Sequence, residues 1–129
     1  MAAAREAQPG MSMEVIGLLL LTVITAATPL VYAALGELVV EKSGVLNLGI
    51  EGMMLAGAVT GFAAVQATGS GLVGVATGIG AGVLVSLIMA LLVLKFYAAQ
   101  VPSGLALTIF GVGLSALLGQ DLVGVAYDG

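Results

Sequence analysis

The chain has 129 residues, of which 60% are hydrophobic and 8% are charged, and its formal net charge is −4. A soluble domain carries about a quarter charged residues, so this composition suits a lipid bilayer as its solvent. Three Lys or Arg residues give no basic face for nucleic acid. Because Cys and His are absent, the usual zinc, haem and iron–sulfur ligands are missing as well, and we expect no cofactor and no metal.

Four apolar stretches are each long enough to cross a bilayer, which takes about 20 residues. We predict membrane-spanning helices at residues 15–35, 45–67, 72–94 and 102–119. The glycine- and serine-rich residues 68–71 separate the second helix from the third. Pro102 begins the fourth, because its missing N–H costs nothing in a first turn. The expected fold class is therefore an all-α membrane protein, a bundle of about four transmembrane helices, with residues 1–14 as a polar tail and residues 15–129 as one transmembrane domain.

A secretory signal peptide is the competing interpretation of residues 15–35. The preceding tail carries one arginine and two glutamates, which is a poor positive region for such a signal. The apolar run is also longer than the core of a typical signal peptide. We therefore favour a retained transmembrane helix.

Glycine is abundant, and small residues recur at four-residue spacing. In lipid, small residues on one face let two helices approach closely. The sets are Gly57/Gly61, Gly74/Gly78/Gly82 and Gly111/Ser115/Gly119. We expect these faces to pack helices together and to carry no other function.

Pro29 falls inside the first predicted span, where it frees a backbone carbonyl near Thr25. A proline in a helix interior usually bends the helix. The hydroxyls of Thr25 and Thr28 are close enough in sequence to satisfy that carbonyl. We expect a structural kink at this point.

Glu51 lies one to two turns inside the second predicted span, with Asn47 four residues earlier on the same helix face. A carboxylate there costs a few kcal/mol unless it faces protein or water. One interpretation is a polar stripe that lines a pathway. The other places Glu51 near the membrane surface, beside Lys42 or a helix N-terminus. Gln100 and Thr108, around the start of the fourth span, either cap that helix or face a lumen.

Two stretches of the chain resemble bacterial ABC-transporter permeases. The first is LGELVVEKSGVLNLGIEGMM at residues 35–54, and the second, residues 100–119, contains SGLALTIFG. The similar group is the simple-sugar and nucleoside uptake permeases, in the class that includes the branched-chain amino acid and ribose-type permeases. The match covers most of residues 29–119. Ala99 replaces an asparagine expected before Gln100, and Pro102 replaces an aliphatic residue.

The resemblance implies a permease subunit of an ABC importer in the plasma membrane that moves a nucleoside or a simple sugar. It implies a second permease subunit, a cytoplasmic ATP-binding subunit that hydrolyses ATP, and an extracytoplasmic solute-binding protein as partners. Family members are considerably longer, so the chain is expected to be the N-terminal part of such a permease. The candidates for lining the solute path are Asn47, Glu51, Gln100 and Thr108.

Two other classes stay open. A secondary transporter or channel also uses intramembrane charges and broken helices, and a non-transporting membrane assembly subunit would be rich in small-residue packing faces. An intramembrane enzyme has the least support, because the sequence offers no nucleophile–base pair.

Overall fold

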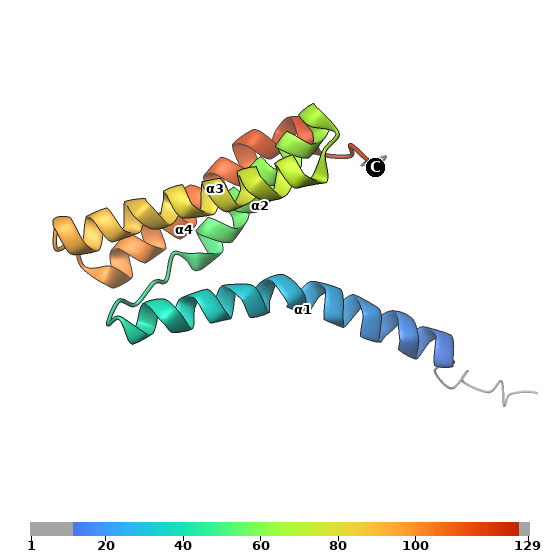
Figure 1. Ribbon diagram of the computed structural model, residues 1–129, viewed down its shortest axis with the longest axis horizontal. Coiled ribbons are helices and arrows are strands. Elements are labelled where there is room, and N and C mark those ends of the chain that lie inside the picture. Colours follow the sequence, from blue (N-terminus) through green and yellow to red (C-terminus); the bar gives the residue numbers. More distant parts are fainter. Residues whose placement is uncertain (1–11, 127–129) are drawn as a thin grey trace, which may run out of the picture. The chain divides into compact units, whose positions relative to one another are not determined.

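The computed structural model describes residues 12–126 (Figure 1). The elements in chain order are α1 (Met13–Lys42), α2 (Ile50–Thr68), α3 (Gly71–Ala90), the π-helical turn η1 (Leu91–Lys95), α4 (Gln100–Gly119) and the 3-10 turn η2 (Gln120–Leu122). Four helices among the described residues are long and apolar enough to cross a membrane. The expected all-α fold with four spans is therefore confirmed. Most of the predicted polar tail lies outside the described residues.

The chain divides into two compact units, Met1–Gly36 and Glu37–Gly129. The described part of the first unit is the longer portion of α1, which continues through Pro29 without a break. The hydroxyls of Thr25 and Thr28 donate to the carbonyls of Leu21 and Ile24, at 2.8 Å in each case. The expectation that they satisfy the carbonyl freed by Pro29 is therefore wrong, because a helical threonine reaches the carbonyl four residues before itself.

Helix α1 ends at Lys42 rather than at residue 35 as predicted. Its 30 residues measure about 45 Å at 1.5 Å per residue, which exceeds the ~30 Å hydrocarbon core. The helix is therefore longer than that core is thick. Lys42 lies in the last turn, where a positive charge is favourable.

The end of α1 is fixed by a glycine cap. Gly44 has φ +86°, a conformation that glycine adopts without strain. The Gly44 N–H donates to the Glu41 carbonyl at 2.9 Å, and the Val45 N–H donates to the Val40 carbonyl at 3.4 Å. These two hydrogen bonds form a Schellman motif, so the chain leaves the helix at Gly44.

Helices α2 and α3 form an antiparallel pair whose glycines face each other. Gly69, with φ +67°, ends α2 and donates its N–H to the Val65 carbonyl, which confirms the predicted break. A Cβ on Gly61 would lie 2.9 Å from the Gly74 carbonyl oxygen, and one on Gly78 would lie 3.0 Å from that of Gly57. The predicted packing faces are thus confirmed at these four glycines.

Gly82, the last member of the predicted α3 set, takes no part in this contact, because a Cβ there meets nothing within 4 Å. A straight helix pair diverges along its length as its axes cross, so a four-residue repeat stays in contact for only part of the helix.

Replacing Gly78 by alanine should lower the thermal stability of the purified protein moderately, by about 1–2 kcal/mol, because overpacking against a backbone carbonyl cannot be relieved by a side-chain rotation. Gly80→Ala is the matched control, since a Cβ there has open space, and it should be neutral or slightly stabilising. Thermal unfolding in detergent measures both. Equal behaviour of the two variants would contradict the α2–α3 packing.

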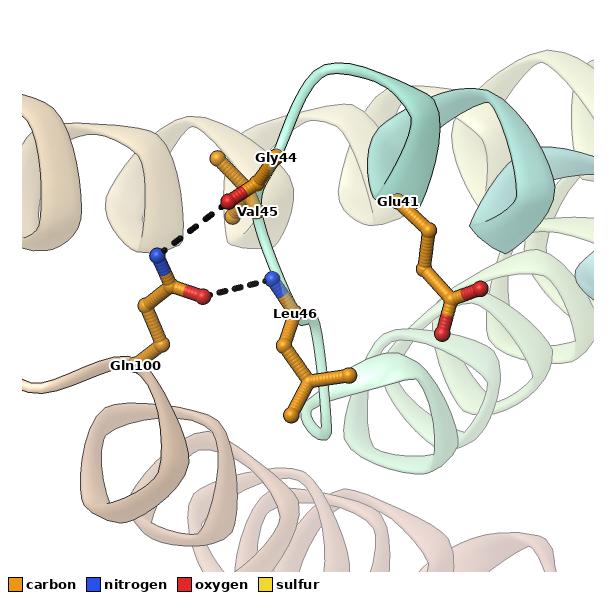
Figure 2. A pocket seen from close by; sticks show the side chains of 5 residues that line it. All are labelled: Glu41, Gly44, Val45, Leu46 and Gln100. Carbon is orange, nitrogen blue, oxygen red and sulfur yellow. Dashed lines mark hydrogen bonds between the residues drawn. The ribbon is translucent and has the colours of Figure 1, made fainter.

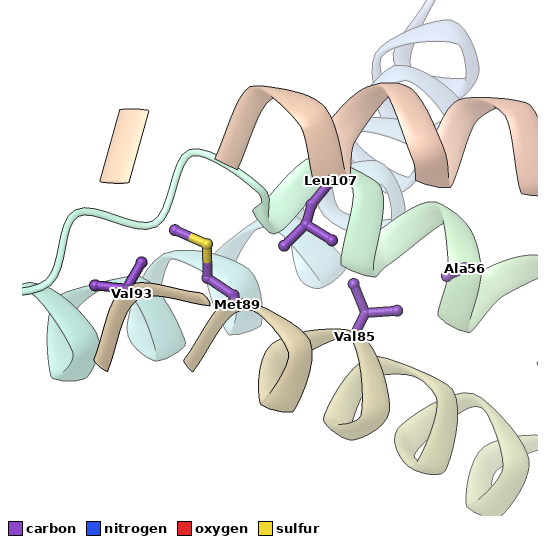
Figure 3. Close-up of a cluster of buried hydrophobic side chains, with 5 residues drawn as sticks. All are labelled: Ala56, Val85, Met89, Val93 and Leu107. Atoms are coloured by element: carbon purple, nitrogen blue, oxygen red, sulfur yellow. The ribbon is translucent and has the colours of Figure 1, made fainter. Parts of the chain in front are cut away.

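The buried core of the second unit lies between α2, α3, η1 and α4. Its side chains are Ala56, Val85, Met89, Val93 and Leu107 (Figure 3). Asn47 is the buried polar residue beside this apolar set, with 7% of its surface exposed. A buried polar residue must find hydrogen-bond partners, and these lead to the site described next.

Helices α2 and α4 touch backbone to backbone through glycines. A Cβ on Gly111 would fall on the Cα and carbonyl of Gly52, and one on Gly104 would lie 2.9 Å from the Leu48 nitrogen. Gly111 therefore packs as predicted, whereas Gly52 and Gly104 were not predicted. Gly119, expected on the same face, reaches only a Val59 methyl at 4.0 Å.

Candidate functional site

Residues 44–49 connect α1 to α2 and are not helical, which corrects the prediction that the second helix starts at residue 45. Apart from Asn47, this segment is apolar in sequence, and nothing in it but Gly44 and Gly49 breaks a helix. Irregular backbone at membrane depth is tolerated only where protein or an aqueous cavity satisfies its polar groups. The structure shows which side chains do so.

Gln100, the first residue of α4, holds the start of the segment with both ends of its amide (Figure 2). Its Oε1 accepts a hydrogen bond from the Leu46 N–H at 2.7 Å. Its Nε2 donates to the Gly44 carbonyl at 3.4 Å. Gln100 therefore replaces, for two backbone groups, the partners that a helix would have supplied.

Thr108 holds the end of the same segment. Its hydroxyl donates to the Leu48 carbonyl at 2.9 Å, across 60 residues of sequence. Thr108 lies about two turns beyond Gln100 on α4. Helix α4 therefore contacts residues 44–49 along most of the length of that segment.

Asn47 is the buried residue at the centre of the segment and precedes the first turn of α2. Its Oδ1 accepts a hydrogen bond from the Gly49 N–H at 3.1 Å, which is the local turn that asparagine side chains favour. Its Nδ2 lies 3.6 Å from the Met53 sulfur. The predicted helix face shared by Asn47 and Glu51 is therefore wrong, because Asn47 is not helical.

Glu37 on α1 completes the set, and sequence reasoning missed it. Its Oε1 accepts a hydrogen bond from the backbone N–H of Asn47 at 3.0 Å. A glutamate that follows a long apolar stretch has the pattern of a residue at the membrane surface. Only its hydrogen bond with Asn47, which is a tertiary contact, distinguishes Glu37 from an ordinary surface glutamate.

The segment runs beside the first turns of α4, from the level of Gln100 to that of Thr108. Gln100 lies level with residues 44–46, and Gly52 in the first turn of α2 lies level with Leu107 and Gly111. At 1.5 Å per residue, the seven residues from Gln100 to Leu107 advance about 10 Å. Helix α2 therefore begins about 10 Å deeper along the bundle than α4 does.

Glu51 is the second residue of α2, and its side chain is exposed on this unit. A carboxylate in the first turn is stabilised by the positive end of the helix dipole, as the second interpretation of the sequence expected. The start of α2 nevertheless lies level with the second and third turns of α4. A position this far along the bundle is the one that a residue lining a pathway would need.

A hollow of about 280 Å³ opens beside the Gln100 amide, lined by Glu41, Gly44, Val45, Leu46 and Gln100 (Figure 2). It brings one carboxylate next to the backbone of the irregular segment. Among the residues that the structure describes, no group of three or more acidic side chains is arranged to hold a metal ion.

Thr108→Val should destabilise the fold by about 1 kcal/mol, because the Leu48 carbonyl would lose its hydrogen-bond donor. Thr77→Val is the control. The Thr77 hydroxyl donates to the Val73 carbonyl of its own helix at 2.8 Å, and this carbonyl keeps its backbone hydrogen bond within the helix when the hydroxyl is removed. Thermal unfolding of the two variants in detergent provides the comparison. A loss as large for Thr77→Val as for Thr108→Val would refute the attachment of the segment.

A family model described as "Branched-chain amino acid transport system / permease component" matches residues 19–128. The chain belongs to this permease family. Its members are membrane components of transport systems, not a class of enzymes, and the four apolar helices make this permease a multi-pass integral membrane protein.

Two curated relatives support the assignment. The permease is 44% identical over 105 residues, 81% of this chain, to the putative glucose ABC transporter permease protein TsgC13 of Haloferax volcanii. It is 29% identical over 119 residues, 88% of this chain, to the guanosine ABC transporter permease protein NupQ of Bacillus subtilis. The matched parts are 32% and 37% of those relatives, so the chain spans about a third of their length. No solved structure matches it.

The four residues expected to line a path thus fall at one place in the permease. Asn47, Gln100 and Thr108 hydrogen-bond residues 44–49, and Glu51 follows directly in the first turn of α2. Contact of any of them with a solute stays a prediction.

Proposed function

We propose that this chain forms part of the transmembrane subunit of an ABC importer, which moves a small polar solute, a nucleoside or a simple sugar, across the plasma membrane. Family membership supports transport, and the two relatives carry names that specify glucose and guanosine. Both solutes are rich in hydroxyls and ring heteroatoms, which hydrogen-bond to amides and carboxylates.

The observation that carries the proposal is the irregular backbone of residues 44–49 inside a bundle of apolar helices. In many transporters, solute sites form where helices are interrupted, because the interruption presents polar groups at membrane depth. Here the interruption is maintained by side chains of Gln100 and Thr108 from another helix. Because hydrogen bonds from a distant helix hold residues 44–49, this segment has a defined shape and is not a flexible loop.

The four candidate residues take two different roles in this proposal. Asn47, Gln100 and Thr108 are positioning residues, because their polar atoms are already engaged with the backbone of the segment. Glu51 is the solute-contacting residue, because its side chain is exposed at the start of α2. An exposed carboxylate at that level cannot face lipid without a cost of several kcal/mol, so we place it toward water or the remaining helices of the permease.

The partners follow from the same class of transporter. A second permease subunit completes the path, a cytoplasmic ATP-binding subunit supplies the energy of hydrolysis, and an extracytoplasmic protein delivers the solute.

Reconstitution of the transporter that contains this chain into lipid vesicles tests the function. With its ATP-binding and solute-binding partners, it should accumulate labelled nucleoside or sugar only when ATP is present on the ATPase side. Dissipation of ion gradients should leave uptake intact. Uptake driven by an ion gradient without ATP would instead favour a secondary transporter, and absence of any flux would favour an assembly subunit.

A further inference from the structure

Glu37 uses its two carboxylate oxygens unequally. Oε1 accepts the hydrogen bond from the Asn47 N–H at 3.0 Å. Oε2 is buried and has no hydrogen-bond partner among residues 12–126. A buried, unpartnered oxygen of a charged group is among the most unfavourable features that a folded protein tolerates, and such a group calls for a physical explanation.

The attachments of the segment to α4 do not share this defect. Gln100 engages both ends of its amide, and Thr108 donates its hydroxyl, so both side chains are neutral and partnered. Gly104 of α4 contacts the backbone of Leu48 and Gly49, and Gly52 of α2 contacts the backbone of α4; neither contact leaves space for even a methyl group. Residues 46–49 are therefore firmly joined to α4, whereas the Schellman motif holds Gly44 and Val45 to the end of α1. Beyond that motif, the Glu37–Asn47 hydrogen bond is the weaker attachment.

We propose that residues 46–49 move together with α4, and that they part from the end of α1 at the Glu37–Asn47 hydrogen bond during the transport cycle. This inference rests on the proposed transport function. The half-satisfied carboxylate makes the closed contact easy to release, because leaving Asn47 frees Glu37 from a position in which one oxygen is buried without a donor. A contact that was fully satisfied would hold the permease in one conformation.

Glu37→Gln tests the role of the charge. The amide oxygen keeps the acceptor for Asn47, while the unpartnered position becomes a neutral group that costs less to bury. The variant should favour the closed contact about tenfold over the wild type, raise the melting temperature of the purified permease by a few degrees, and slow uptake per molecule. An unchanged melting temperature and uptake rate would overturn the proposal.

Two further variants separate this role from simple bracing. Glu37→Met removes both oxygens and leaves the Asn47 N–H unpaired, so its melting temperature should fall while that of Glu37→Gln rises. Glu14→Gln makes the same chemical change in the first turn of α1, where the side chain is exposed, and should behave as wild type. A fall for both Glu37 variants would mean that Glu37 only braces the fold, and would also overturn the proposal.

The movement itself can be measured with spin labels on two introduced cysteines, in a transporter whose other cysteines have been replaced. Val39→Cys on α1 and Ile109→Cys on α4 introduce labels at exposed positions. The distance between them should change when purified transporter goes from the nucleotide-free to the ATP-bound state, and Glu37→Gln should suppress the change. A distance that is the same in both states of the wild type would refute the separation. If ATP-driven uptake fails altogether, the opposite melting-temperature shifts of Glu37→Gln and Glu37→Met still test the contact.

Discussion

Replacement of Gly111 by alanine is expected to separate α2 from α4 and to reduce the yield of folded permease at least severalfold. A Cβ at this position would overlap the Cα and the carbonyl oxygen of Gly52 and would lie 2.7 Å from the Gly52 carbonyl carbon. Backbone atoms cannot rotate away, so the two helices must part. Overpacking of this kind costs about 1–3 kcal/mol or more, which exceeds the ~1 kcal/mol that alanine gains over glycine in a helix.

Gly113→Ala is the matched control for this prediction. It lies two residues further along α4, where a Cβ meets nothing within 4 Å, and the change in helix propensity is the same. Size-exclusion chromatography of the detergent-solubilised protein, with thermal unfolding of the folded fraction, compares the two variants. If Gly111→Ala and Gly113→Ala give the same yield and stability, helices α2 and α4 do not pack as described.

The second large effect is expected for Glu51→Leu, which should abolish solute uptake while the protein still inserts and assembles. Leucine removes the charge and the hydrogen-bonding capacity of a residue that we place in the path. Loss of its contact with the solute should reduce uptake by more than tenfold, since one charged hydrogen bond is worth about 1.5–3 kcal/mol. Glu51→Gln keeps the shape and one acceptor oxygen, so it should retain part of the activity.

Uptake must be normalised to assembled transporter for this test. If Glu51 only stabilises the start of α2, Glu51→Leu should lower the amount of protein and leave uptake per molecule normal. Asn47→Ala serves as the contrasting variant, because its side chain caps the Gly49 N–H; it should lower stability by about 1 kcal/mol. Unchanged normalised uptake in both variants would end the hypothesis that these residues serve the solute path.

Much of the fold could be predicted because local signals agree with it. The apolar stretches define the four helices, and Gly69 ends α2 in the left-handed conformation that only a few residues adopt readily. The α4 helix begins at Gln100 instead of Pro102, yet the reason for placing a proline there holds. Backbone N–H groups throughout the first turn have no partner within the helix, so Pro102 costs nothing as its third residue.

The irregular segment could not be predicted, because its cause lies elsewhere in the chain. Residues 45–48 are apolar or uncharged and continue directly into a helical sequence. Their non-helical conformation is stabilised by Gln100 and Thr108, which are more than 50 residues away, and by Glu37 from α1. Candidate residues chosen for their polarity therefore lie together around this segment, but sequence periodicity assigned Asn47 a helical position that tertiary hydrogen bonds override.

Collision with water-soluble and lipid-soluble reagents is the most direct test of the central claim, that α2 begins inside the membrane with Glu51 facing an aqueous path. Glu51→Cys and Ile109→Cys introduce single spin labels at comparable levels, because residues 107–111 of α4 contact the first turn of α2. The Ile109 side chain is apolar and 73% exposed on this unit. In bilayers, a label at 51 should collide with a water-soluble nickel chelate, whereas a label at 109 should be shielded from it. If both labels collide equally with the chelate, this level lies at the membrane surface; if neither does, no aqueous path reaches Glu51, and either result contradicts the account.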